Sequence, residues 1–466
     1  MSDGAAIEAQ RRLLAMRPHD PELARDLALA LTEQGRLEEA EAALDLAVLV
    51  APARADIAAL RGETRLARVR ALFARGQVGA GVALLEVLLG RPGLLPPLLA
   101  RAAGLLAAAG AAPLAEAAAR RALTGDPDRA DCWVTLGLAL YQQDRLDAAL
   151  AAWERALVLA PGHVAAACDA AMVHLAQGDL ARGFAGFERR RGNVPALPVP
   201  AALAGRHVVL QGEQGLGDTL HFARYAALVA EAGATVTLRV QPGLVRLLAG
   251  MNGVAAAIGD DTASPPADFD LPLASMPLLF GTTLASIPAL VPYVAADPGA
   301  VAKWRARLAA LPGLKVGLAW AGDPRRTVET RAMDARRSVD LSVLTPLALP
   351  GVALVSLQKT TGPKDAVQPV PAGMVLHDWT SELADFADTA ALVAALDLVV
   401  TVDTAIVHLA GALGRPVWLV NRFDADWRWL RGRDDSPWYP TLRQFRQTAP
   451  GDWAGVVARV AAALAA

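Results

Sequence analysis

The spacing of apolar residues changes once along the chain and divides it into two regions. Up to about residue 192 the apolar positions follow a helical period, and prolines recur at nearly constant intervals. These prolines are Pro18, Pro52, Pro92, Pro127, Pro161 and Pro195. Three of the five intervals are 34 residues and one is 35, so the region predicts a row of similar helix pairs. We expect four or five pairs, the second longer and less regular than the others.

The best copy of the repeat lies between Pro127 and Pro161. It has large, small and closing residues where a tetratricopeptide repeat (TPR) has them: Trp133, Leu136, Gly137, Ala149, Trp153, Ala156 and Pro161. Turns between the two helices of the repeats are predicted at Gly35, Gly76, Gly110, Asp144 and Gly178. Stacked pairs present a concave groove. This groove either docks a protein or peptide, or the repeats serve as a spacer or dimerisation arm.

Beyond the repeats, short apolar strands alternate with helices, which predicts an α/β fold. The expected domains are repeats over 1–192, a Pro- and Gly-rich linker over 193–206, and two Rossmann-like halves over 207–300 and 301–466. The predicted strands are His207–Gln211, Thr235–Val240, Lys315–Trp320, Val352–Leu357, Met374–Leu376, Leu398–Val402 and Val417–Val420. Helices are predicted over Thr219–Ala232 and Trp453–Ala465.

The stretch 397–420 is the most informative part of the α/β region. An apolar strand ends at Val402, Asp403 and Thr404 open a helix, and a Gly-Arg-Pro turn precedes the next strand. Thr404 is expected to cap this helix, whose N–H groups and dipole suit a phosphate. His408, four residues after Thr404, lies on the same helix face and can point at the phosphate.

The turn after the first predicted strand is the second candidate site. It carries glycines that permit close backbone approach, among them Gly215 and Gly217, followed by Asp218. Its spacing lacks the dinucleotide-binding fingerprint. Asp218 is either a functional carboxylate or a helix cap, and His221, on the same helix face, either orients an acceptor or packs in the core.

Together these two motifs resemble those of bacterial heptosyltransferases. The residues that carry the resemblance are the turn Gly215-Leu216-Gly217-Asp218 and the unit from Val402 to Ala410. The resemblance implies a GT-B fold in which Asp218 is the general base beside the acceptor and the terminal helix crosses back onto the first half. It also implies that Asp403, Thr404 and His408 bind a nucleotide sugar, with Ala405 where the family commonly has glycine. Repeats followed by such halves resemble bacterial TPR-linked protein glycosyltransferases, distant in plan to O-GlcNAc transferases.

Several basic residues are candidates for binding the donor phosphates. Arginines crowd the loop after the strand ending at Trp320, and they either bind phosphate or stay solvated: Arg325, Arg326, Arg331, Arg336 and Arg337. Arg337 is our choice, because it lies closest to the next regular element, and Lys359 is a second candidate.

The segment 426–439 concentrates tryptophans and arginines, which either stack a base or sugar or pack as a lid on the core. Two DxD sequences, at Asp268 and at Asp424, suggest a metal-nucleotide motif that a GT-B site does not need. We therefore expect neither a metal nor a cofactor, with the nucleotide sugar as co-substrate.

Composition and charge limit the kinds of partner and the cellular compartment that we expect for this protein. A formal net charge of −2 gives no reason to propose nucleic acid as a partner. The most apolar stretch, 93–119, is interrupted by prolines and charges, so no membrane span is expected. Two isolated cysteines and the absence of a signal-peptide pattern indicate the cytoplasm.

The resemblance, together with the repeats, implies a glycosyltransferase that moves a sugar from a nucleotide sugar to a protein held in the TPR groove. Flagellin is a candidate acceptor by analogy with TPR-linked relatives. One alternative is a transferase for lipopolysaccharide or lipid-linked sugar, in which the repeats serve assembly. Another is a non-catalytic TPR scaffold that binds nucleotide.

Overall fold

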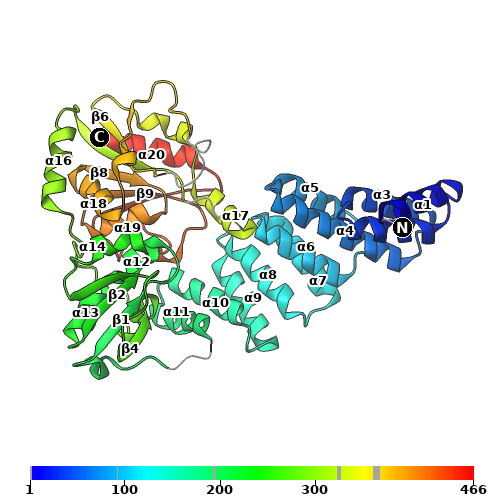
Figure 1. The fold of residues 1–466 in the computed structure, drawn as a ribbon, viewed down its shortest axis with the longest axis horizontal. Helices are drawn as coiled ribbons and strands as arrows, with labels where there is room; N and C mark the ends of the chain where they lie inside the picture. Colours follow the sequence, from blue (N-terminus) through cyan, green and yellow to red (C-terminus); the bar gives the residue numbers. More distant parts are fainter. Residues whose placement is uncertain (1–2, 92, 193–195, 323–326, 360–367) are drawn as a thin grey trace. The chain divides into compact units, whose positions relative to one another are not determined.

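The structure is a computed structural model, and it describes residues 3–91, 93–192, 196–322, 327–359 and 368–466 (Figure 1). The described chain separates into two compact units. The first holds residues up to 166 together with the first part of α17 (Val328–Arg337), and the second holds the other described residues.

The first unit is a row of antiparallel helices. Its helices are α1 (Asp3–Met16), α2 (Pro21–Glu33), α3 (Leu37–Val50), α4 (Ala55–Ala74), α5 (Val78–Leu89), α6 (Pro96–Ala108), α7 (Ala112–Gly125), α8 (Ala130–Tyr141) and α9 (Leu146–Leu159). The second predicted pair is indeed the long one, because α4 has 20 residues. In the best copy a Cβ on Gly137 would lie 2.5 Å from Nε1 of Trp153, so only glycine lets this buried indole pack against α8.

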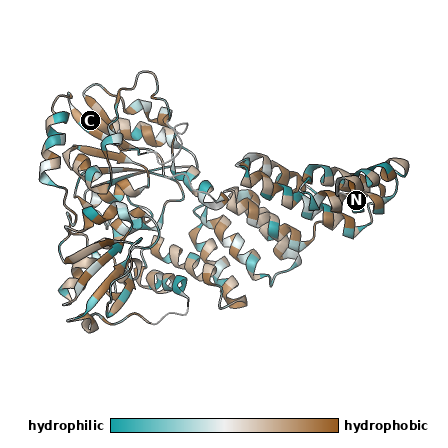
Figure 2. Ribbon diagram, viewed as in Figure 1, coloured by the Kyte–Doolittle hydropathy of each residue, from teal (hydrophilic) through white to brown (hydrophobic). Residues whose placement is uncertain are grey.

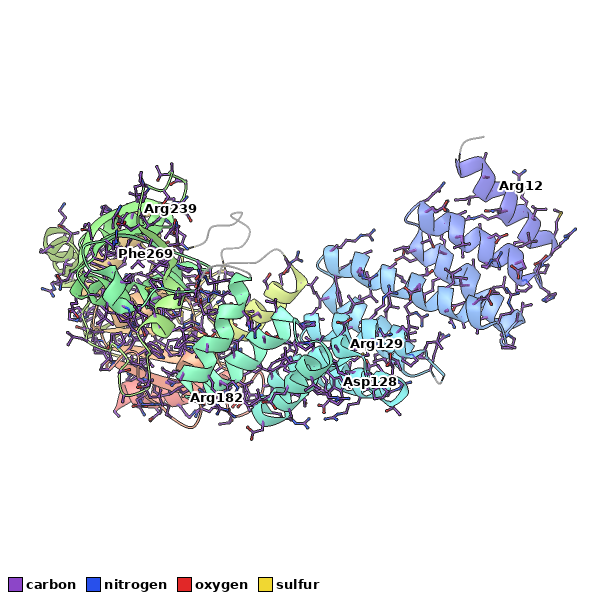
Figure 3. The ribbon with its side chains drawn as sticks, turned by 90° about the horizontal axis from the view of Figure 1, so that it is seen from below. Arg12, Asp128, Arg129, Arg182, Arg239 and Phe269 are labelled. Carbon is purple, nitrogen blue, oxygen red and sulfur yellow. The ribbon has the colours of Figure 1, made fainter. Side chains whose placement is uncertain are left out.

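The predicted turns between paired helices are confirmed. Gly35, Gly76, Gly110 and Gly178 have φ of 71°, 78°, 76° and 87°, and Asp144 has a φ of 56°. Glycine and, less often, Asp adopt this left-handed conformation. Between pairs, ion pairs hold the loops, as in the turn after α7, where Arg129 Nε lies 3.1 Å from Asp126 Oδ2. Arg129 is labelled in Figure 3, which draws the side chains along the helices. These contacts are local, so each helix pair follows from its own sequence.

The fifth helix pair belongs to the second unit from residue 167 onward. It consists of α10 (Val164–Ala176) and α11 (Leu180–Phe187), which meet where Gly183 approaches Leu175. The ring of Phe184 on α11 packs edge-on against Trp427, with centroids 5.6 Å apart. Arg190 Nη2 in η1 (Glu188–Arg191) lies 2.7 Å from Glu213 Oε2. The last repeat is therefore packed on the α/β region.

The α/β region contains two parallel sheets, which confirms the predicted fold class. The first has the order β3-β2-β1-β4 and the second β10-β9-β8-β5-β6-β7. The strands are β1 (His207–Gln211), β2 (Thr235–Val240), β3 (Val254–Gly259), β4 (Phe269–Pro272), β5 (Leu314–Ala319), β6 (Val352–Ser356), β7 (Leu376–His377), β8 (Leu398–Thr401), β9 (Val417–Asn421) and β10 (Leu442–Arg446). The central strands are hydrophobic along their length (Figure 2), as expected where helices cover both faces.

Helices and short 3-10 turns connect and cover the strands. In the first half these are η2 (Pro200–Leu203), α12 (Leu216–Ala223), α13 (Tyr225–Glu231), α14 (Pro242–Leu248), η3 (Leu273–Ser275) and α15 (Met276–Leu279). In the second half they are α16 (Pro298–Leu308), η4 (Leu341–Leu347), η6 (Thr380–Glu382), α18 (Phe386–Ala395), α19 (Ala405–Ala412), η7 (Trp427–Trp429) and α20 (Trp453–Ala465).

Two helix predictions need correction. The helix predicted over Thr219–Ala232 is broken at Arg224, whose buried guanidinium donates to the carbonyls of His221 and Trp438 and ends α12. The terminal helix has the predicted bounds, but it does not cross to the first half. Its buried valines, Val456, Val457 and Val460, join the core of the second sheet, and α20 packs against η4 and β10.

Candidate functional site

Each sheet has one point where the strand order reverses, and the two candidate motifs lie at these points. In the first sheet, β2 pairs with one side of β1, and β4, which comes later in the chain, pairs with the other side. In the second sheet, β6 pairs with one side of β5, and the later strand β8 pairs with the other side. Ligands of doubly wound sheets bind at the carboxyl ends of the strands at such points. Asp218 follows β1, and Asp403 follows β8.

The helices that begin at these two points, α12 and α19, lie against each other between the sheets (Figure 1). A Cβ on Gly217 would lie 2.9 Å from Cδ2 of His408 and 3.4 Å from Cα of Ala405. The close approach that Gly217 permits is therefore to α19. Gly215 is the residue before α12, and its N–H donates to Oδ2 of Asp218 at 3.0 Å. The predicted residues of the two motifs thus form one cluster.

Asp218 has two partners, one local and one distant. One carboxylate oxygen accepts the Gly215 N–H, which is the helix-capping role considered in the sequence analysis. The other accepts from Nη2 of Arg428 at 2.6 Å, across 210 residues of sequence. Asp218 can cap the helix and still be accessible to a ligand, because its side chain is 26% exposed.

Arg428 is the centre of a buried charge cluster. Besides Asp218 it contacts Asp426, with Nη1 3.0 Å from Oδ1, and its guanidinium lies 4.4 Å from the ring centroid of Trp427. Its side chain is 9% exposed. The flanking carboxylates Asp426 and Asp218 oppose the effect of burial and raise the pKa of Arg428. It is therefore a permanent cation at the junction of the two halves.

His408 and His221 are both buried and meet at one hydroxyl group. Nδ1 of His408 lies 2.9 Å from the Tyr439 hydroxyl, and Nδ1 of His221 lies 3.2 Å from it. The ring of Trp429 stacks on His408 at 5.5 Å and 21°. Burial lowers the pKa of both imidazoles well below the ordinary value, and Arg224 and Arg428 lower it further. Both rings are neutral near pH 7.

Asp403 and Thr404 lie where the sequence predicted, at the strand end before α19. Burial raises the pKa of the Asp403 carboxyl and Asp426 raises it further, while Arg422 and Arg337 oppose them. Thr404 occupies the N-cap position but its side chain makes no capping hydrogen bond. Its hydroxyl lies 3.4 Å from that of Thr401. The predicted side-chain cap is therefore wrong, because Thr404 turns toward β8.

Of the two predicted cations, Arg337 contacts the cluster and Lys359 makes its contacts elsewhere. Arg337 reaches it: Nη1 donates to the Asp403 carbonyl at 3.3 Å, and Nε lies 3.0 Å from Oδ1 of Asp334. Lys359 donates instead to the carbonyls of Leu383 and Ala384. Arg325 and Arg326 lie outside the described residues.

The aromatic segment 426–439 supplies residues that the sequence analysis did not assign, above all Arg428 and Tyr439. Trp429, Trp438 and Tyr439 are fully buried, so they pack as core around the two histidines. Of the two interpretations of this segment, packing is the one observed. The high density of aromatic and arginine residues in this segment is the sequence feature that could have pointed to Arg428 and Tyr439.

The acidic pairs of the DxD sequences bind within the protein. Asp424 Oδ2 accepts from Arg336 Nε at 3.0 Å, and Asp268 Oδ2 accepts the His207 N–H at 2.8 Å. Within the described ranges no group of three or more His, Cys, Asp or Glu residues is arranged to hold a metal ion. Nor, in the part of the chain that the structure describes, does any helix have the length and apolarity that crossing a membrane requires.

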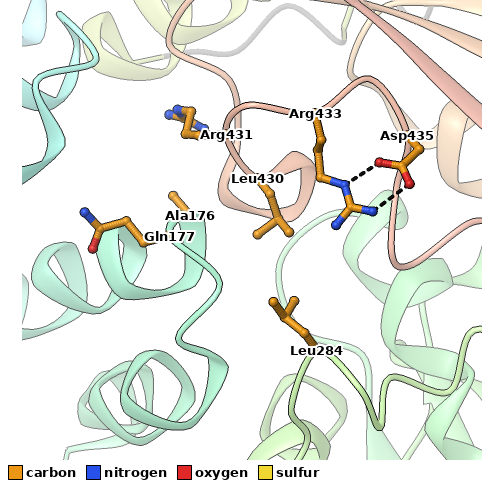
Figure 4. A pocket seen from close by; sticks show the side chains of 7 residues that line it. All are labelled: Ala176, Gln177, Leu284, Leu430, Arg431, Arg433 and Asp435. Atoms are coloured by element: carbon orange, nitrogen blue, oxygen red, sulfur yellow. Dashed lines mark hydrogen bonds and ion pairs between the residues drawn. The ribbon is translucent and has the colours of Figure 1, made fainter.

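A separate hollow of about 640 Å³ opens beside the end of α10 (Figure 4). It is lined by Ala176, Gln177, Leu284, Leu430, Arg431, Arg433 and Asp435. In this hollow Arg433 forms an ion pair with Asp435. None of the predicted site residues lines it, so the charge cluster and the hollow are distinct features.

Comparisons with known families agree with this division of the chain. Residues 4–64 and 130–163 match tetratricopeptide repeat families, and residues 383–419 match glycosyltransferase family 9 (heptosyltransferase). The last match includes β8 and α19 with Asp403 and His408. The chain combines tetratricopeptide repeats with a heptosyltransferase-like domain, and these matches support a glycosyltransferase.

Individual proteins are similar to this chain over different shares of its length. Protein FlbA of Caulobacter vibrioides is 28% identical over 417 residues, covering 74% of this chain and 68% of FlbA. The E. coli ADP-heptose lps heptosyltransferase II is 13% identical, covering 56% of this chain and all of its own, with a TM-score of 0.36. The TPR protein YrrB is 16% identical, covering 39% of this chain and 91% of its own, with a TM-score of 0.32.

Proposed function

We propose that the protein is a cytoplasmic GT-B glycosyltransferase that needs no metal ion and transfers a sugar from a nucleotide sugar to a protein. In this proposal the tetratricopeptide repeats hold the acceptor, and flagellin is our candidate for it. One observation carries the proposal: the strand-order reversals of two parallel sheets bring α12 and α19 together, with Asp218 on one side and Asp403 on the other. The family 9 match at 383–419 supports the donor side, and the repeat matches support a protein partner.

The donor diphosphate binds at the start of α19. The first N–H groups of a helix and its dipole attract an anion, and the Thr404 side chain does not occupy them. Ala405 and His408 form the adjoining surface toward Gly217. Arg337, which reaches the Asp403 carbonyl, is the proposed cation for the phosphates, and Lys359 is the second candidate.

Asp218 acts as the general base for the acceptor hydroxyl. The hydroxyl oxygen attacks the anomeric carbon, its proton passes to Asp218, and the bond to the diphosphate oxygen breaks. The nucleoside diphosphate leaves with the bonding electron pair, stabilised by the start of α19 and by cations. Gly215 and Gly217 shape the turn. His221, on α12, is fully buried and packs in the core rather than contacting the acceptor.

The ion pair between Arg428 and Asp218 sets the order of events. In the ion pair, Nη2 of Arg428 donates to Oδ1 of Asp218 at 2.6 Å, so this oxygen is occupied before an acceptor hydroxyl arrives. An arriving diphosphate is a stronger competitor for the guanidinium, because it carries more charge. We therefore propose that the donor binds first, draws Arg428 toward the phosphates and releases Asp218 for the acceptor.

The test is a screen of the full-length protein against UDP, GDP, CMP and ADP sugars. A nucleotide at a hundredfold excess over its Kd should stabilise the protein by about 2.7 kcal/mol, which thermal unfolding detects. The nucleotide sugar so found is then supplied with purified flagellin, and transfer is followed by mass spectrometry. Transfer to lipopolysaccharide alone would favour the sugar-acceptor alternative, and binding without transfer to either would favour the scaffold.

A further inference from the structure

The hydroxyl of Tyr439 lies between two imidazoles that belong to different halves of the α/β region. It is 2.9 Å from Nδ1 of His408 on α19 and 3.2 Å from Nδ1 of His221 on α12. His221 and Tyr439 are fully buried, and His408 is 5% exposed. Burial raises the pKa of Tyr439 well above its ordinary value, so the hydroxyl keeps its proton. Three neutral groups therefore share one chain of hydrogen bonds.

The proton count restricts how this chain is arranged. A neutral imidazole carries one N–H, and the hydroxyl carries one O–H. The Tyr439 hydroxyl also interacts with Tyr293 and Arg224, so the two imidazole contacts alone do not fix the position of its proton. When the hydroxyl donates to one imidazole, that imidazole accepts the proton at Nδ1, and the other donates its own Nδ1–H to the Tyr439 oxygen. The two histidines are then opposite tautomers.

His221 decides between the two arrangements. Its Nε2 is buried and has no hydrogen-bond partner among the described residues. A buried N–H without a partner is rarer in proteins than an acceptor without one. The proton of His221 is thus better placed at Nδ1, donating to Tyr439, while Nε2 keeps an unpaired acceptor. Tyr439 then donates to His408 over the shorter of the two distances, and His408 carries its proton on Nε2.

The Nε2 side of His408 faces the junction of α12 and α19. A Cβ on Gly217 would lie 2.9 Å from Cδ2 and 3.6 Å from Nε2 of His408, and Gly217 immediately precedes Asp218. Trp429, stacked on the ring at 21°, holds the imidazole plane. An N–H at this position can donate to a phosphate oxygen without carrying a positive charge.

We propose that Tyr439, itself bonded to His221, is a positioning residue that holds His408 as the Nε2–H tautomer, so that this N–H donates to the donor diphosphate. The inference rests on the proposed function for the identity of the ligand. The tautomer itself depends only on the hydrogen-bond chain. Tyr439 contacts neither substrate in this arrangement and acts through His408 alone.

The experiment records the ¹⁵N shifts of the histidines in the full-length protein at pH 7.5, with His408 assigned from His408→Gln. The expected result is a protonated Nε2 and an unprotonated Nδ1 in His408 of the parent protein. In Tyr439→Phe the two tautomers should both be populated, and binding of inorganic pyrophosphate should weaken by roughly 3- to 10-fold, the range of one neutral hydrogen bond. Tyr225→Phe is the matched control, because Tyr225 is equally buried and its hydroxyl lies 2.8 Å from that of Thr282.

A parent His408 protonated on Nδ1, or an unchanged tautomer in Tyr439→Phe, overturns the inference. The parent spectrum needs no variant, so a poorly folded Tyr439→Phe does not obscure the answer. If the tautomer is as stated and pyrophosphate does not bind, the role of Tyr439 toward His408 stands, and the diphosphate ligand and the proposed function fail.

Discussion

Nη2 of Arg428 lies 2.6 Å from Oδ1 of Asp218, and this pair connects the loop after β9 to the helix after β1. The same guanidinium binds Asp426, so one buried cation balances two carboxylates from different halves. The sequence singled out Asp218, but it gave no sign that Arg428 is the partner of this carboxylate.

Replacing Asp218 by Asn tests its role as general base separately from its role as helix cap. Asn can still accept the Gly215 N–H, so the helix start should be kept. We expect transfer to slow by roughly 10²- to 10⁴-fold, while nucleotide affinity is retained or raised, because Asn competes less with the donor phosphates for Arg428. The measurement is single-turnover transfer with saturating nucleotide sugar and acceptor. A rate within a few-fold of the parent would remove Asp218 from the mechanism.

Replacing Arg428 by Met should destabilise the protein by about 3 to 5 kcal/mol, because Asp218 and Asp426 lose their shared buried cation. Urea unfolding followed by tryptophan fluorescence measures the change. Arg433→Met is the control: its ion pair with Asp435 has side chains 32% and 64% exposed. Such a pair contributes about 1 kcal/mol or less. Equal losses in both variants would mean that Arg428 is only a surface charge in solution.

Gly217→Ala should separate α12 from α19. The added Cβ would lie 2.9 Å from His408, which cannot move freely because Trp429 and Tyr439 hold its ring. Overpacking of this kind costs about 1 to 3 kcal/mol, and nucleotide binding should weaken as well. Gly243→Ala on α14 has no atom within 4 Å of the added Cβ and should be neutral or slightly stabilising. Thermal unfolding and nucleotide titration compare the two, and an unperturbed Gly217→Ala would refute the contact.

Stability should fall as the pH drops below about 6.5, the ordinary pKa of histidine. His221 is buried and its folded pKa is lowered, so below pH 6.5 the unfolded chain binds a proton that the folded protein does not. Each such group changes the unfolding free energy by at most about 1.4 kcal/mol per pH unit. His221→Phe should therefore flatten the decline between pH 6.5 and 5.5. The parent and the variant have the same carboxylates, so the effect of these groups on the unfolding free energy cancels in the comparison. Identical slopes of unfolding free energy against pH in the two proteins would count against a buried neutral His221.

Deleting residues 1–161 should leave nucleotide binding intact and abolish efficient transfer to a protein acceptor. The cut precedes α10 because Phe184 on α11 packs on Trp427, so the fifth helix pair is needed to cover the α/β region. Calorimetric titration with the identified nucleotide and a transfer assay at sub-saturating acceptor measure the two effects. Transfer at the parent rate would show that the repeats do not choose the acceptor.

Local chemistry explains what could be read from the sequence. The bounds of β1, β2 and α20 match the predicted ranges, and the turns at Gly35 and Asp144 have the predicted conformation. Continuous apolar runs and residues suited to positive φ act over a few neighbours. The strands that were not predicted, β3, β4 and β10, are all at sheet edges. Edge strands need less continuous apolar sequence, because one side has no strand neighbour.

The sequence by itself determined the repeat period, the two-sheet architecture and the motifs that contain Asp218, Asp403 and His408, because each depends on short-range patterns. Only the tertiary structure decided the partners of these residues. Arg428 meets Asp218 across 210 residues, and Tyr439 joins His221 to His408 across 218 and 31. Such pairs form because the strand-order reversals of two sheets place α12 against α19, and no local spacing in the chain encodes which distant loop will fill the space beside them.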